Sequence, residues 1–127
     1  EDSLTRGVGT LAYMSPEMIN EEDYDFKTDV YSFGIVLYAL FVGTLPKQSM
    51  KDKINKKEIT VPPASDNMSE FCRELISKCL APSPSDRPAF VDILFQMRRN
   101  SYQLANNVNP SIISQRDNEL TAIEELL

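Results

Sequence analysis

One stretch of this sequence, from about residue 28 to Val42, constrains the fold more than any other, because its apolar residues cover almost the whole circumference of a helix. Thr28 or Asp29 can cap this helix, and Gly43 followed by Pro46 ends it. The apolar residues are Val30, Phe33, Ile35, Val36, Leu37, Ala39, Leu40, Phe41 and Val42. Such a helix should be buried on all sides, and a chain of 127 residues cannot easily surround it. The stretch therefore predicts the central helix of a domain larger than this chain.

Helix signals dominate the rest of the sequence, and strand signals are nearly absent. Caps or apolar periodicity predict helices at 16–19 after Ser15, at 49–57, at 69–80 after Ser69, from Pro88 to about 99, and at 117–127. The apolar face of the helix that Pro88 opens is expected from Val91, Ile93, Leu94 and Met97, with Arg98 and Arg99 near its end. The predicted fold class is therefore mainly α.

Connecting segments are predicted where helix signals fail. Residues 1–16 and 81–86 are expected to be loops, and the polar, asparagine-rich stretch 100–114 is expected to be flexible. Gly34, within the central helix, costs about 1 kcal/mol relative to alanine. It therefore indicates either a close backbone approach or a break in the helix.

Composition excludes several classes of protein. The chain is 42% hydrophobic and 25% charged, which is ordinary for a globular protein and argues against disorder of the whole chain. Its net charge of −6 argues against nucleic acid or an anionic membrane as the main partner. No stretch reaches the roughly 18–20 apolar residues of a membrane span, and the first residues lack the features of a signal peptide. A cytoplasmic location is the expectation.

The two cysteines are expected to pack in the core. Cys72 and Cys79 fall on one predicted helix and lie roughly 10 Å apart along its axis, too far for a disulfide. The sequence contains no histidine, which excludes a histidine-dependent catalytic triad and argues against a zinc site.

Four blocks of the sequence resemble the eukaryotic protein kinase family, in the family's order. Gly9-Thr10-Leu11-Ala12-Tyr13-Met14-Ser15-Pro16-Glu17 resembles the end of an activation segment, with Ser-Pro-Glu in place of Ala-Pro-Glu. Asp29-Val30-Tyr31-Ser32-Phe33-Gly34 resembles the start of the central helix of the large lobe, and Gly43-Thr44-Leu45-Pro46 the turn after it. Residues 75–80 and Asp86-Arg87-Pro88-Ala89-Phe90 resemble the next paired helices. The pattern is most similar to serine/threonine kinases, of the tyrosine-kinase-like branch.

The resemblance implies roles for individual residues. Glu17 is expected to form a buried ion pair with Arg87, and Asp29 to accept hydrogen bonds from the catalytic loop; a simple helix cap is the alternative for Asp29. Thr10 is expected to contact the catalytic loop, and Leu11, Ala12 and Tyr13 to receive the substrate residue after the phosphorylated one. The segment lacks the proline, basic residue and tryptophan usual in tyrosine kinases, so serine or threonine is the expected acceptor. Ser3 and Thr5 are candidate phosphorylation sites.

The resemblance also implies parts that are not in this sequence. There is no Gly-rich loop, Val-Ala-Ile-Lys, His-Arg-Asp or Asp-Phe-Gly motif, so no catalytic, metal or cofactor residue is assigned; ATP and Mg²⁺ are expected to bind the full-length parent. Residues 1–99 are interpreted as the C-terminal part of a kinase catalytic domain, the helical subdomain of the large lobe, and 100–127 as a tail with a short amphipathic helix. Its expected partners are the N-terminal part of the kinase domain and a protein substrate.

Two functional hypotheses stay open at this point. The first is a C-terminal fragment of an active serine/threonine kinase, inactive alone, which holds the substrate and braces the catalytic loop. The second is a non-catalytic module, either pseudokinase-like or a helical docking domain. The coding sequence upstream of Glu1 would distinguish them, because the first hypothesis requires Asp-Phe-Gly and His-Arg-Asp motifs there.

Overall fold

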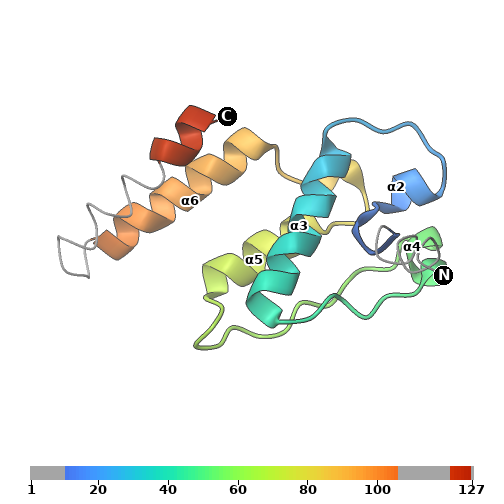
Figure 1. Ribbon diagram of the computed structural model, residues 1–127, viewed down its shortest axis with the longest axis horizontal. Coiled ribbons are helices and arrows are strands. Elements are labelled where there is room, and N and C mark those ends of the chain that lie inside the picture. The colour runs from blue at the N-terminus through green and yellow to red at the C-terminus, as the bar shows by residue number, and fades with distance from the viewer. Residues whose placement is uncertain (1–10, 106–120, 127) are drawn as a thin grey trace. The chain divides into compact units, whose positions relative to one another are not determined.

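The computed structural model describes residues 11–105 and 121–126 (Figure 1). Its named elements, in chain order, are α2 (Pro16–Ile19), α3 (Lys27–Val42), α4 (Met50–Ile54), α5 (Glu70–Cys79), the 3₁₀ turn η1 (Pro84–Asp86) and α6 (Phe90–Ala105). The described residues contain no strand, only an isolated antiparallel bridge between Ser65 and Met68. The predicted mainly α fold class is confirmed. The chain divides into two compact units, Glu1–Pro88 and Ala89–Leu127.

The central helix, α3, begins without a side-chain cap. Phe26 occupies the N-cap position in a helical conformation and makes no capping hydrogen bond. The prediction that Thr28 or Asp29 caps this helix was wrong, because both residues lie inside its first turn. The Asp25 carboxylate instead accepts a hydrogen bond from the Lys27 backbone N–H at 2.9 Å. The predicted end is confirmed: Gly43 adopts a left-handed conformation with φ of 95°, and its N–H donates to the Ala39 carbonyl.

One side of α3 is buried and the other is exposed. Tyr31, Ile35 and Tyr38 lie at the spacing of one helix face and belong to the main hydrophobic core. The other buried members of this core are Val61, Met68, Ile76 and Leu80. Three large apolar side chains of α3 remain exposed: Val36, Leu40 and Phe41. Burial on all sides, expected from the sequence, is therefore not realised among the described residues.

Helices α3 and α5 lie close together at Gly34. A Cβ atom on Gly34 would lie 2.8 Å from Cys79 Cβ and 2.9 Å from Leu80 Cδ2, so the helix contains a close contact here and not a break. Helix α5 begins as predicted, with the Ser69 hydroxyl accepting the Cys72 backbone N–H at 3.1 Å. Cys79 is a free, fully buried thiol, and burial raises its pKa to about 12. This thiol packs in the core.

Helices α2 and α4 are short and pack against each other (Figure 1). The Ser15 hydroxyl accepts the Met18 N–H at the start of α2, as the sequence predicts. A reciprocal capping box between Ser49 and Asp52 opens α4. This helix ends at Ile54, before the predicted Lys57, because Lys56 adopts a left-handed conformation with φ of 55°.

The second unit contains α6 and a helical stretch at 121–126. The prediction that Pro88 lies in the first turn of α6 was wrong, because the helix begins at Phe90, with Ile93 N–H donating to the Ala89 carbonyl. The helix continues to Ala105, beyond the end predicted near Arg99. Ile93 is buried as expected, whereas Val91 is exposed. Arg98 donates to both carboxylate oxygens of Glu124, at 2.6 and 2.7 Å. No helix among residues 11–105 and 121–126 is long and apolar enough to cross a membrane.

Candidate functional site

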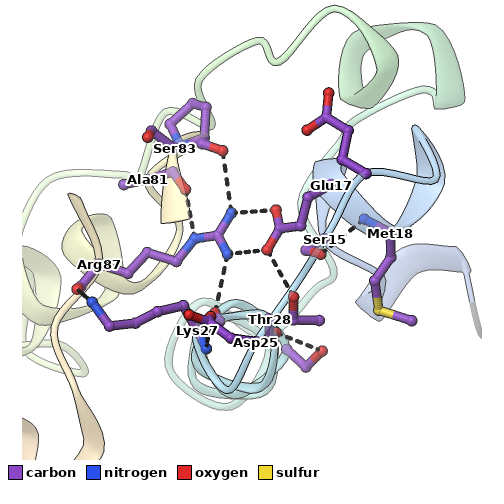
Figure 2. A network of polar contacts seen from close by, with 12 residues as sticks. Ser15, Glu17, Met18, Asp25, Lys27, Thr28, Ala81, Ser83 and Arg87 are labelled. Atoms are coloured by element: carbon purple, nitrogen blue, oxygen red, sulfur yellow. Dashed lines mark hydrogen bonds and ion pairs between the residues drawn. The ribbon is translucent and has the colours of Figure 1, made fainter. Parts of the chain in front are cut away.

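A buried ion pair joins the start of the first unit to its end (Figure 2). Arg87 Nη1 lies 2.6 Å from Glu17 Oε2, and Arg87 Nη2 lies 2.9 Å from Glu17 Oε1. Both residues are 2% exposed. The geometry is bidentate, the arrangement in which a planar guanidinium binds a carboxylate most strongly. The structure thus brings together two residues that are 70 positions apart in the sequence.

Every N–H group of the Arg87 guanidinium has an acceptor. Besides the two bonds to Glu17, Nε donates to the Ala81 carbonyl at 2.8 Å. Nη1 donates to the Lys27 carbonyl at 3.0 Å, and Nη2 to the Pro82 carbonyl at 3.2 Å. A guanidinium has five N–H donors, so this site uses all of them. Arg87 is therefore hydrogen-bonded to α2, to the start of α3 and to the loop after α5 (Figure 2).

The carboxylate of Glu17 is held in its charged form. Burial on its own would raise the pKa of Glu17, but hydrogen bonds from Arg87, from its own backbone N–H and from the Thr28 hydroxyl lower that pKa to about 2. The Thr28 hydroxyl donates to Oε2 at 2.8 Å. Thr28, expected from the sequence to be a helix cap, thus completes the ion-pair network.

A second buried cation, Lys53, holds the segment that precedes α2. Its ammonium group donates to the carbonyls of Leu11, Ala12 and Met14 at 2.7, 2.8 and 2.8 Å. Lys53 is 4% exposed, and burial lowers its pKa to about 8. The ammonium therefore remains mostly charged at neutral pH.

The sequence offered only a weak signal for Lys53. It lies three positions after Met50 in α4, so the two share a helix face, yet a lysine at such a position is usually read as solvated. Its partners are three backbone carbonyls more than thirty residues away, which no sequence pattern identifies. Lys53 was therefore missed as a site residue.

A small pocket opens beside this segment. It has a volume of about 250 Å³ and is lined by Leu11, Ala12, Gln48, Met50 and Lys53. Two of the three residues predicted to receive the substrate, Leu11 and Ala12, line this pocket. The third, Tyr13, is exposed, and its carbonyl accepts a hydrogen bond from the Ser32 hydroxyl of α3 at 2.7 Å.

Of the remaining predicted residues, the structure describes only Asp29. Asp29 is exposed in the first turn of α3, and its carboxylate has no hydrogen-bond partner among residues 11–105 and 121–126. Thr10, Ser3 and Thr5 lie outside the described residues. The role expected for Asp29, as an anchor for a catalytic loop, therefore stays a prediction.

The described part of the chain contains no cluster of side chains suited to a metal ion. Its cysteine and acidic side chains form no group of three or more that could hold one. The buried lysine, Lys53, uses its donors on backbone carbonyls. No step of phosphoryl transfer is therefore assigned to a nucleotide held by these residues.

Comparisons with known proteins show the family of the chain. The sequence pattern of the protein kinase domain matches residues 1–97. The chain belongs to the protein kinase family.

Individual relatives have kinase names. The chain is 31% identical over 99 residues to a dual specificity protein kinase, splA, of Dictyostelium discoideum, covering 75% of this chain and 4% of that protein. It is 39% identical over 92 residues to the serine/threonine/tyrosine-protein kinase HT1 of Arabidopsis thaliana, covering 68% of this chain and 23% of that protein. It is 35% identical over 96 residues to the human mixed lineage kinase domain-like protein, covering 71% and 20%. The chain thus spans less than a quarter of the length of these relatives.

Proposed function

We propose that this chain forms the peptide-binding end of the activation segment and the helices beneath it in a serine/threonine protein kinase. The Glu17–Arg87 ion pair is the observation that carries the proposal. It fixes the Ser15-Pro16-Glu17 motif to the loop after α5 with a buried, fully hydrogen-bonded contact. A segment anchored in this way presents the residues just before it at a constant position, as a peptide-binding surface requires.

The backbone just before Ser15 is also held by hydrogen bonds from side chains. The carbonyls of Leu11, Ala12 and Met14 accept from Lys53, and the carbonyl of Tyr13 accepts from Ser32. Four successive carbonyls are therefore bound to side chains of α3 and α4. This arrangement leaves the Leu11 and Ala12 side chains in the wall of a pocket, where they can contact a peptide.

In the proposed kinase, bound ATP would supply the γ-phosphoryl group and Mg²⁺ would neutralise its charge. The contribution of this chain is to bind and orient the protein substrate. Asp29, exposed at the start of α3, is proposed to accept hydrogen bonds from the catalytic loop of the same kinase. The absence of the tyrosine-kinase pattern in residues 9–17 supports serine or threonine as the acceptor.

The test is phosphoryl transfer by the complete protein that contains this chain. We expect it to phosphorylate peptides with serine or threonine acceptors in the presence of Mg²⁺ and ATP, and to leave matched tyrosine peptides unmodified. These 127 residues alone, as the control, should neither transfer phosphate nor show Mg²⁺-dependent nucleotide binding. Transfer to tyrosine alone, or no transfer by a complete protein with intact His-Arg-Asp and Asp-Phe-Gly motifs, would contradict the proposal.

A non-catalytic docking module is the second candidate. The exposed apolar side chains of Val36, Leu40 and Phe41 on α3 favour it, because such surfaces are common where proteins bind one another. A coding sequence without kinase motifs upstream of Glu1 would select this candidate. A cooperative, high-temperature melt of the isolated chain as a soluble monomer would favour it as well.

A further inference from the structure

We infer that Lys53 is a positioning residue which shapes the pocket beside Leu11 and Ala12 for an apolar substrate side chain; the inference rests on the proposed function. A lysine in the wall of a peptide-binding pocket would ordinarily select an acidic side chain. In this structure the contacts of the ammonium group indicate the opposite preference.

The ammonium of Lys53 has no free donor. An ammonium group carries three N–H bonds, and the carbonyls of Leu11, Ala12 and Met14 lie at 2.7, 2.8 and 2.8 Å. No carboxylate among residues 11–105 and 121–126 pairs with it. An acidic side chain entering the pocket would have to displace one of these carbonyls, or remain without a donor from Lys53. Either outcome costs free energy, because a buried polar group without a partner is destabilising.

The same three bonds fix the backbone from Leu11 to Met14. A buried charge is tolerated only where hydrogen bonds compensate it, so Lys53 and the three carbonyls depend on one another. The Met14 N–H also donates back to the Leu11 carbonyl at 3.2 Å, which closes a tight turn around the ammonium. Removal of the ammonium would take one donor from each of the three carbonyls and would loosen this turn.

The rest of the pocket wall is suited to an apolar group. Leu11 and Met50 offer apolar side chains, Ala12 a methyl group and Lys53 its aliphatic stem. Gln48 is partly engaged, since its amide oxygen accepts from the Tyr31 hydroxyl and one of its two N–H groups donates to the Lys57 carbonyl. The pocket therefore takes a side chain such as leucine or methionine from the substrate.

Peptide kinetics with the complete protein test this specificity. Three peptides would differ only at the residue after the acceptor: leucine, glutamate or lysine. We expect the leucine peptide to have the lowest KM, about tenfold below the other two. Burial of a leucine side chain favours binding by enough free energy to raise affinity about tenfold. A preference for glutamate would overturn the inference.

Substitution of Lys53 tests the positioning role. Lys53→Met keeps the stem and removes the donors; we expect KM for the leucine peptide to rise about tenfold, while KM for ATP and kcat at saturating peptide change little. Lys53→Arg should recover part of this loss, and Lys51→Met, at an exposed position of the same helix, should have no effect. A lower kcat with unchanged peptide KM, as expected from a smaller folded fraction, would contradict the positioning role.

Two further measurements keep the inference testable if Lys53→Met does not fold or the wild-type protein is inactive. Met50→Lys adds a free ammonium to the pocket, so it should shift the preference toward the glutamate peptide; an unchanged preference would count against the pocket.

Hydrogen exchange at residues 11–14 can be measured without kinase activity. Lys53→Arg should speed up this exchange, and Lys51→Met should not. Equal exchange rates in all three proteins would exclude the positioning role. Absence of phosphoryl transfer with altered exchange would instead remove only the proposed function.

Discussion

The guanidinium of Arg87 lies 4.9 Å from the ring centre of Tyr31, a fully buried residue of α3. The ammonium of Lys53 lies 5.6 Å from the same ring. One aromatic side chain thus contacts both buried cations, the one that anchors Glu17 and the one that holds Leu11–Met14. Such contacts stabilise a cation by about 0.5–2 kcal/mol each, and more when water is excluded. Tyr31 therefore links the two hydrogen-bond networks of the site.

Two replacements of Tyr31 distinguish the contribution of its ring to stability from that of its hydroxyl. Tyr31→Phe keeps the ring and loses only the hydrogen bond to Gln48, so it should lower the free energy of unfolding by about 1 kcal/mol. Tyr31→Leu also removes both cation contacts and part of the core, and should cost about 3 kcal/mol. Urea unfolding of the complete kinase domain measures both values. Equal costs for the two variants would show that the ring does not support the cations.

Separation of Glu17 from Arg87 should be strongly destabilising. Glu17→Ala or Arg87→Ala leaves a buried charge without its partner, and each should cost about 3–5 kcal/mol. The double variant should cost clearly less than the sum of the two, because no unpaired charge remains. Chemical unfolding of the wild type, the two single variants and the double variant measures this double-mutant cycle. Additive losses of stability would contradict the ion pair.

Acid should weaken the domain through the same carboxylate. The pKa of Glu17 falls from an ordinary 4.5 to about 2 in the folded protein. Its contribution is therefore fully present above pH 5 and is lost as the pH falls toward 2. The full contribution is about 3 kcal/mol. Glu17→Gln, which cannot ionise, should lower stability at pH 7 and flatten this part of the pH profile. An equally steep profile in Glu17→Gln would assign the acid sensitivity to other groups.

Gly34→Ala tests the contact between α3 and α5. Alanine improves helix propensity by about 1 kcal/mol, but its Cβ would lie 2.8 Å from Cys79 Cβ, an atom fixed close to the backbone. Overpacking at such a point costs about 1–3 kcal/mol, so the net effect should be a loss of stability by about 1 kcal/mol. Val36→Ala, at an exposed position of the same helix, is the control and should change the thermal midpoint little. A higher midpoint for Gly34→Ala would indicate that the helices can move apart.

Much of the fold could be predicted because its signals are local. The hydroxyl caps at Ser15 and Ser69 and the left-handed Gly43 act within one turn of their helices. The start of α3 could not be predicted, because Phe26 occupies the N-cap position without using its side chain. Apolar periodicity also could not show which face of α3 the chain covers, since that depends on α5 and the segment around Val61.

Some residues of the site could also be predicted from the sequence, and others could not. The Glu17–Arg87 contact, expected from the resemblance to kinases, lies between two recognisable sequence motifs. The roles of Lys53 and Thr28 depend on partners that only the tertiary fold brings near. Neither residue carries a motif that would single it out. The resemblance therefore identified the ion pair, and the structure was needed to find the residues that surround it.

Photo-crosslinking of a bound peptide tests the central claim most directly. A serine peptide with a photoreactive leucine analogue after the acceptor would be bound to the complete protein, irradiated, and its attachment site mapped by mass spectrometry. We expect attachment at Leu11, Ala12 or Met50, in the wall of the pocket, and competition by the unlabelled leucine peptide. Attachment outside the first unit, or crosslinking that the unlabelled peptide does not reduce, would contradict the assignment of this segment as the peptide-binding site.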